Sequence, residues 1–159
     1  MAELLHWEDF PPVDVLEMGS HTFGEEEIIA FARQFDPQVF HTDPVAARDS
    51  FLGGLIASGW HTCAIAMRLM VDRYVGHSAS LGSPGLDNIR WLAPVRAGDT
   101  VTYRRIITAS RASASKPDLG LVQSRWEAVN QRGETVMTME GWGMFRRRNK
   151  ATKDTSPSG

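Results

Sequence analysis

Asp36 and His41 are the two residues whose types and spacing first indicate chemistry. They lie five positions apart in a turn-rich segment, and Gly59 follows eighteen positions after His41, at the start of an apolar helical pattern. A carboxylate and an imidazole can exchange protons with a bound molecule. An unpaired backbone N–H at a helix start can receive a developing negative charge. The spacing therefore predicts an acid/base pair that faces an oxyanion site.

Two helical patterns position this pair. Residues 25–34 repeat apolar side chains at helical spacing, which predicts an amphipathic helix with Phe31 and Phe35 on its buried side. Pro37 disfavours helical geometry in the residue before it, so this helix should end at Asp36. A short helix is expected over residues 44–48, capped by Asp43.

The central helix is predicted to begin at Gly59, with Ser58 as N-cap, and to continue through the apolar segment at residues 60–75. Its apolar positions cover most of the circumference. A helix that is apolar nearly all round is one that the rest of the protein wraps.

Five further segments are expected to be strands. Residues 13–20 alternate loosely, and four later runs are rich in Val, Ile, Thr, Trp and Tyr: residues 86–95, 100–113, 119–131 and 134–147. Residues 131–134 predict a tight hairpin turn. A buried helix followed by antiparallel strands predicts an α+β fold, in which a curved sheet wraps a central helix and a helical segment overhangs it.

The composition predicts one domain at residues 1–148 and a disordered tail at residues 149–159. The chain has 159 residues, 42% of them hydrophobic, and a formal net charge of −2. That charge gives no basic field for nucleic acid or an anionic membrane. Cys63 is the only cysteine, no charged-then-apolar leader opens the chain, and no apolar run is long enough to span a bilayer. We therefore expect a cytoplasmic protein.

The chain resembles the MaoC-like, (R)-specific enoyl-CoA hydratases of the hotdog fold. The resemblance covers about residues 22–147 and rests on Asp36, His41 and the helix-start Gly59, followed by a strand that begins after Pro94-Val95 and Gly98-Asp99. It implies a hydratase or dehydratase that acts on an acyl-CoA thioester and needs no cofactor beyond the coenzyme A of the substrate. Asp36 and His41 would handle the two protons, and the Gly59 N–H would receive the thioester oxygen.

The chain also departs from the family pattern. Many members carry Asn-Pro between the aspartate and the histidine, and a serine on the central helix that orients the aspartate; the corresponding helical region here is residues 65–68, without a serine. Ser58 or Thr62 is expected to take over part of that role. Trp60 is a candidate wall of an acyl tunnel.

Arginines are the candidate ligands for the phosphates of coenzyme A. Arg90 and Arg96 lie near an early strand turn, and a third candidate is the basic run at residues 146–148. His61 and Cys63 are two apart on a helix and do not face one way, so no metal site is predicted.

Two other functions stay open at this point. A hotdog thioesterase shares the fold but relies on an acidic residue on or near the central helix, and residues 58–70 contain no Asp or Glu. A non-catalytic acyl-thioester-binding module is the second. Hotdog domains pair through their sheets, so the resemblance also implies a homodimer or higher homo-oligomer.

Overall fold

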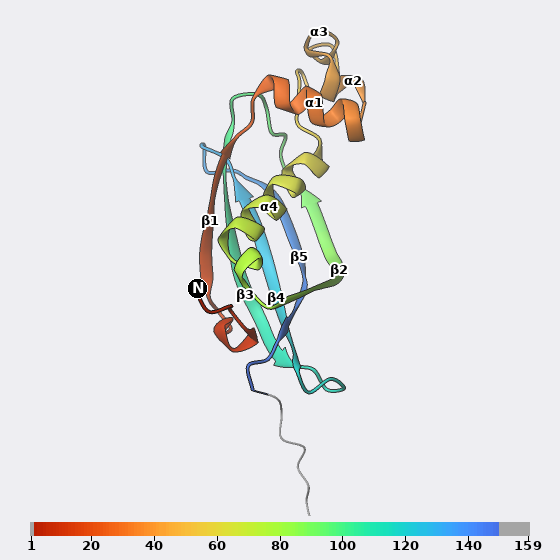
Figure 1. Cartoon of the computed structure of the whole chain (residues 1–159). Helices are drawn as coiled ribbons and strands as arrows, with labels where there is room; N and C mark the ends of the chain where they lie inside the picture. Colours follow the sequence, from red (N-terminus) through yellow and green to blue (C-terminus); the bar gives the residue numbers. More distant parts are fainter. Residues whose placement is uncertain (1, 150–159) are drawn as a thin grey trace, which may run out of the picture.

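The computed structural model describes residues 2–149, and in it one curved antiparallel sheet wraps a central helix (Figure 1). The sheet has five strands in the order β1-β3-β4-β5-β2. Their bounds are β1 Val15–Thr22, β2 Ser80–Trp91, β3 Thr100–Ala112, β4 Leu119–Val129 and β5 Thr135–Arg146. The central helix α4, Gly59–Arg73, lies against the concave face. This arrangement is the predicted α+β hotdog fold.

Three short helices overhang one end of α4 (Figure 1). They are α1 (Glu25–Phe35), α2 (Val39–Thr42) and α3 (Pro44–Ala47). Asp43 caps α3 by accepting from the N–H groups of Val45 and Ala46, as predicted. Two single-turn 3-10 helices, η1 (Trp7–Asp9) and η2 (Val75–His77), complete the described elements.

The face of the sheet toward α4 is set by alternation along β4. Every second residue of this strand is buried, including Val122, Trp126 and Ala128. Alternate residues of a strand point to opposite faces, so these side chains form the floor under α4. The predicted hairpin turn joins β4 to β5, with Gly133 at a φ of 78°.

The prediction that α4 is wrapped on all sides is wrong for this chain on its own. Its buried residues are His61, Thr62, Ala66 and Met70, whereas Trp60 and Met67 are 57% and 46% exposed. A row of large apolar side chains on α4 therefore faces outward. One sheet can cover only one side of a helix. The apolar residues on the other side of α4 therefore form a surface that this chain alone leaves exposed.

Two smaller predictions also need correction. Phe35 is 64% exposed, because the buried stripe of α1 runs through Ile28 and Ala32 and stops one turn before it. Strand β2 begins at Ser80 and ends at Trp91, not at residues 86 and 95. Gly82 and Gly85 adopt positive φ there, and bulges let this glycine-containing stretch pair with β5.

The two ends of the described chain meet at the end of the sheet far from the overhang (Figure 1). Arg148 pairs with Asp9 at 2.8 Å, and the Asn149 N–H donates to Glu8. The rest of the predicted tail lies outside the described residues. No helix among residues 2–149 is long and apolar enough to cross a membrane.

His61 links α4 to the overhang through aromatic contacts. Its ring stacks on Phe31, with centroids 4.6 Å apart, and meets the edge of Phe23 at 5.0 Å. The side chain is buried, and Nδ1 has no hydrogen-bond partner among the described residues. Burial lowers the pKa of His61, nearby Glu27 raises it and His21 lowers it again, so the net direction is down.

Acidification should therefore destabilise the fold through His61. The stability that neutral His61 contributes is complete above its unfolded pKa of about 6.5 and is lost as the pH falls through the lower folded value. Urea unfolding between pH 7.5 and pH 5 should show a smaller loss for His61→Phe than for the wild type. The exposed His77→Gln variant is the control and should keep the wild-type pH dependence; an unchanged dependence in His61→Phe would contradict this role.

Candidate active site

Asp36 and His41 are brought together by the end of α1 and the single turn of α2. Asp36 is the C-cap of α1, where Pro37 stops the helix as predicted, and its N–H donates to the Ala32 carbonyl at 2.8 Å. His41 lies near the end of α2 and is 5% exposed. Its Nε2 lies 3.2 Å from Asp36 Oδ2. The structure therefore assembles the predicted pair.

Two side-chain donors hold the Asp36 carboxylate. Ser58 Oγ donates to Oδ2 at 2.7 Å, and Gln38 Nε2 donates to Oδ1 at 2.7 Å. Burial raises the pKa of Asp36, but these two hydrogen bonds and the charge of His41 lower it by more, so the net pKa lies below its ordinary value. Asp36 is therefore ionised at neutral pH.

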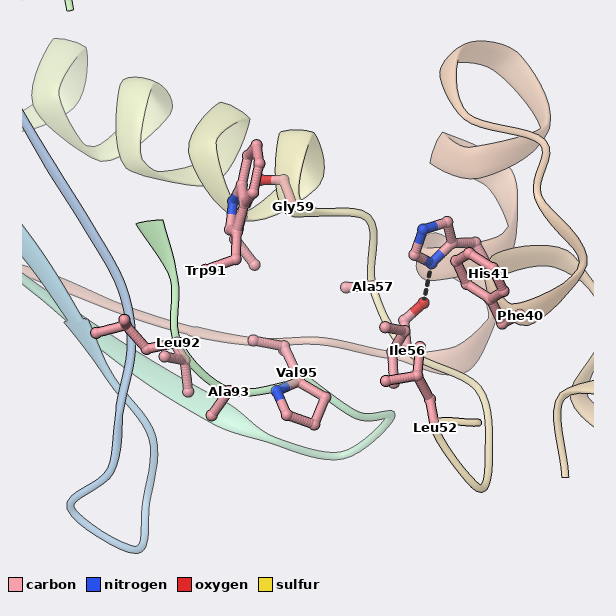
Figure 2. A pocket seen from close by; sticks show the side chains of 13 residues that line it. Phe40, His41, Leu52, Ile56, Ala57, Gly59, Trp91, Leu92, Ala93 and Val95 are labelled. Carbon is pink, nitrogen blue, oxygen red and sulfur yellow. Dashed lines mark hydrogen bonds between the residues drawn. The ribbon is translucent and has the colours of Figure 1, made fainter. Parts of the chain in front are cut away.

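The other side of the imidazole is fixed by the backbone. His41 Nδ1 lies 2.7 Å from the Ile56 carbonyl, the contact drawn as a dashed line in Figure 2. A carbonyl only accepts, so Nδ1 carries a proton. Nε2 is left as the nitrogen that exchanges a proton with Asp36 or with a bound molecule.

A cavity of about 320 Å³ lies between the overhang, the start of α4 and the end of β2 (Figure 2). His41 and Gly59 both line it, whereas Asp36 does not. The other walls are mostly apolar: Phe40, Leu52, Ile56, Ala57, Thr62, Trp91, Leu92, Ala93, Pro94, Val95 and Val136. This is the size and character of a small-molecule site with few polar groups.

Gly59 is confined by Trp91, whose indole lies against the first turn of α4 (Figure 2). A β-carbon at Gly59 would lie 2.3 Å from Cε2 of Trp91. The indole thus occupies the space that a β-carbon would take. The Gly59 N–H donates to no described residue, which leaves it free for an oxyanion.

The four predicted substrate-binding residues lie in different places. Thr62 lines the cavity and donates from Oγ1 to the Gly59 carbonyl at 2.7 Å, while Ser58 supports Asp36 from behind. Trp60 lies outside the cavity and packs edge-on against Trp91. Arg90 is exposed on β2, and its Nη1 donates to the Ile89 carbonyl at 3.2 Å.

The remaining arginine candidates also differ in position. Arg96 donates from Nη2 to the carbonyl of Leu52, a residue of the cavity wall, at 2.6 Å. The basic run at residues 146–148 follows β5 at the opposite end of the sheet (Figure 1). Of these arginines, Arg96 is the one that lies beside the site.

Ser58 caps α4 and also supports Asp36, and the substitution Ser58→Ala tests both roles. Its Oγ accepts from the Trp60 N–H at 3.3 Å as the N-cap of α4 and donates to Asp36. Ser58→Ala should cost about 1 kcal/mol of unfolding free energy as a lost N-cap and raise the pKa of Asp36. Chemical unfolding and the pH profile of turnover would check both. The Ser78→Ala variant is the control, because its hydroxyl bonds the Val75 carbonyl beyond the C-terminal end of α4. A stability loss with an unmoved pH profile would contradict the second role.

The chain matches the MaoC like domain family over residues 10–123. It is similar to the crystal structure of a MaoC-like dehydratase from Rhodospirillum rubrum, with 38% identity, a TM-score of 0.84 and coverage of 91% of this chain and 99% of that chain. It is 30% identical to Protein MaoC of Klebsiella aerogenes over 62% of this chain and 29% of that protein. It is also 32% identical to Mesaconyl-CoA hydratase of Cereibacter sphaeroides over 43% of this chain and 20% of that protein. The chain thus spans less than a third of these two curated relatives.

Because the family match takes in the Asp36–His41 pair, Gly59 and most of the sheet, the chain belongs to the MaoC-like domain family.

Proposed function

We propose that the protein adds water to the double bond of an enoyl-CoA thioester, or removes it from a 3-hydroxyacyl-CoA. The observation that carries this proposal is the Asp36–His41 pair, in contact at 3.2 Å, beside a cavity that also contains the free Gly59 N–H. Two relatives, named a dehydratase and a CoA-thioester hydratase, support the same class of reaction.

Hydration needs two proton transfers and one charge to be stabilised. Asp36 and His41 hold a water molecule and take one of its protons, while its oxygen bonds to the β-carbon of the enoyl thioester. The π electrons move through the α-carbon onto the thioester oxygen, and the Gly59 N–H receives the resulting negative charge. The pair then returns a proton to the α-carbon. Dehydration runs through the same steps in reverse.

The dipole of α4 also stabilises the negative charge on the thioester oxygen. An α-helix carries roughly half a positive elementary charge at its N-terminus, and α4 runs for 15 residues from Gly59. The cavity walls are mainly aliphatic and aromatic, and apolar walls of low dielectric strengthen the interaction between this dipole and the oxygen. His41 lines the cavity and Asp36 does not, so His41 is the member of the pair that meets the substrate, and Asp36 holds it through the 3.2 Å contact.

We also propose that two copies pair through β2 and the outward side of α4. β2 is an edge strand of 12 residues, and Leu86 and Trp91 on it are exposed. On α4, Trp60 and Met67 are exposed as well, and Trp60 packs against Trp91. An open apolar edge of this kind pairs with another strand when one is available. Light scattering should give a dimer for the wild type and a smaller species for Met67→Asp; a monomeric wild type would contradict the pairing.

The test of the activity is the absorbance of the conjugated thioester. Purified protein should remove it saturably with short, medium or branched enoyl-CoAs and release no free thiol. Thiol release in the parallel assay would make the protein a thioesterase. If neither loss of absorbance nor thiol release is seen, but CoA esters stabilise the protein against heat, the protein would be a binding module.

A further inference from the structure

His61 is a buried histidine that does not line the active-site cavity but joins the two helices that carry the site. It lies in the first turn of α4, two residues after Gly59. Its ring is stacked on that of Phe31 in α1, with centroids 4.6 Å apart and planes 7° apart. The stack therefore connects the overhang, where α1 leads into the Asp36–His41 pair, to the helix start that presents the oxyanion donor (Figure 1).

The stack acts together with a second contact between the same two helices. Ser58 Oγ donates to Asp36 at 2.7 Å, which ties the C-cap of α1 to the N-cap of α4. The ring of His61 meets Phe31 in an earlier turn of α1. One contact lets two helices rotate about it, whereas two separated contacts fix the angle between them. Catalytic groups need this support, because they must be held to within about 0.5 Å of the productive geometry.

The surroundings of His61 favour its neutral form. The ring meets the edge of Phe23 at 5.0 Å, and its Nδ1 has no hydrogen-bond partner among the described residues. Glu27 of α1 favours protonation of His61 and His21 of β1 opposes it, while α4 has no Asp, Glu, Lys or Arg before Arg68. Glu27 Oε1 already lies 2.8 Å from His21 Nε2. Burial outweighs the attraction of Glu27, so the pKa of His61 lies below its ordinary value.

We propose that neutral His61 is a positioning residue: its stack on Phe31 keeps the acid/base pair of the overhang aligned with the Gly59 N–H. Protonation places a charge in an apolar contact, so the ring leaves the face of Phe31 for water. The helix α1 can then tilt relative to α4, which moves the acid/base pair away from the oxyanion donor. This inference rests on the proposed function, because it assigns His61 to the alignment of the same site.

Hydrogen–deuterium exchange of the full-length protein tests the stack without turnover. His61→Phe keeps an aromatic ring at this position and cannot be protonated. At pH 5 the amides of α1 should exchange at least about threefold faster in the wild type than in His61→Phe, because only the wild type gains a proton when the stack opens. At pH 7.5 the two proteins should agree within about twofold. The exposed His77→Gln variant should match the wild type at both values.

The exchange data also separate local opening from unfolding of the whole chain. Buried amides of β4 exchange only when the whole fold opens, whereas a helix that tilts away on its own exchanges faster than they do. We expect α1 to exchange faster than β4 in the wild type at pH 5. Equal α1 rates in the wild type and His61→Phe, or α1 rates no faster than those of β4, would overturn the proposal.

The kinetic test is the ratio of kcat for His61→Phe to kcat for the wild type, measured with an enoyl-CoA across the same pH range. Titration of the acid/base pair is common to both proteins and cancels in this ratio. The ratio should be within about twofold of one at pH 7.5, and should rise by up to tenfold per pH unit as the pH falls through the lowered pKa of His61. A role in stability alone leaves the ratio flat while both proteins stay folded.

Substitutions on both sides of the stack test it at neutral pH, even where His61→Phe fails to fold. His61→Ala should lower kcat by about 10–10²-fold, because the reacting groups lose their alignment, and should leave KM within about threefold. Phe31→Ala should cause a similar loss. The double variant should be within about twofold of either single variant, since all three remove one contact. Losses that multiply in the double variant would contradict a shared role.

Failure of this inference and failure of the proposed reaction give different results, because the exchange experiment needs no substrate. A wild type that hydrates no enoyl-CoA overturns the proposed reaction, whatever the exchange shows. Faster exchange of α1 together with a flat kcat ratio overturns the positioning role of His61 alone.

Discussion

Asp36→Asn should lower kcat for enoyl-thioester hydration by about 10²–10⁴-fold, the range that one acid/base group contributes. Asparagine keeps the shape of the side chain and can still accept the hydrogen bond from Ser58 Oγ. It cannot hold the negative charge that lies 3.2 Å from His41 Nε2, so the pair loses the carboxylate that takes part in its proton transfers. Stopped-flow absorbance of the conjugated thioester measures the change.

Asp43→Asn is the matched control for this loss. Asp43 lies in the same overhang, and its carboxylate accepts from the N–H groups of Val45 and Ala46 as the cap of α3. Its variant should therefore keep kcat within about twofold and lose at most ~1 kcal/mol of stability. An Asp36→Asn enzyme with more than a tenth of the wild-type kcat would remove Asp36 from the chemistry.

Gly59→Ala should be the second severe substitution, because it affects both packing and the oxyanion site. The added β-carbon would lie 2.3 Å from Trp91, so the indole or the first turn of α4 must move. Overpacking of this kind costs about 1–3 kcal/mol, and a shift of ~1 Å in the Gly59 N–H lowers kcat by about 10²-fold. Thermal unfolding and steady-state kinetics would measure the two effects.

Two further variants test whether a clash with Trp91 causes the effects of Gly59→Ala. Gly24→Ala is the control, because a β-carbon there meets no atom within 4 Å and the φ of −81° suits alanine. Trp91→Leu in the Gly59→Ala background frees the space and should restore most of the stability. If the double variant is no more stable than Gly59→Ala alone, the clash with Trp91 is not what the glycine avoids.

The parts of the site that could be predicted from the sequence are those set by local chemistry. Pro37 ends α1 at Asp36, and the short turn of α2 then returns His41 to the carboxylate within five residues. Ser58 and Gly59 were placed correctly at the start of α4 because N-cap preferences depend on neighbours in sequence.

The parts that could not be predicted depend on contacts between distant residues. Trp91 is 32 positions from Gly59, and no periodicity in β2 indicates that its indole closes the start of α4. Arg105 likewise reads as one polar residue among several on β3, yet it is buried under α4 beside Tyr74. The outward apolar side of α4 was misassigned because an apolar composition does not show which side of a helix the sheet covers.

The most direct test of the proposed reaction is mass spectrometry of an enoyl-CoA incubated with the protein in water labelled with heavy oxygen. The account predicts an intact acyl-CoA that has gained one labelled water, with the label in its 3-hydroxyl group, formed about 10²–10⁴-fold more slowly by Asp36→Asn. Free CoA together with a labelled carboxylic acid would contradict it and make the protein a thioesterase.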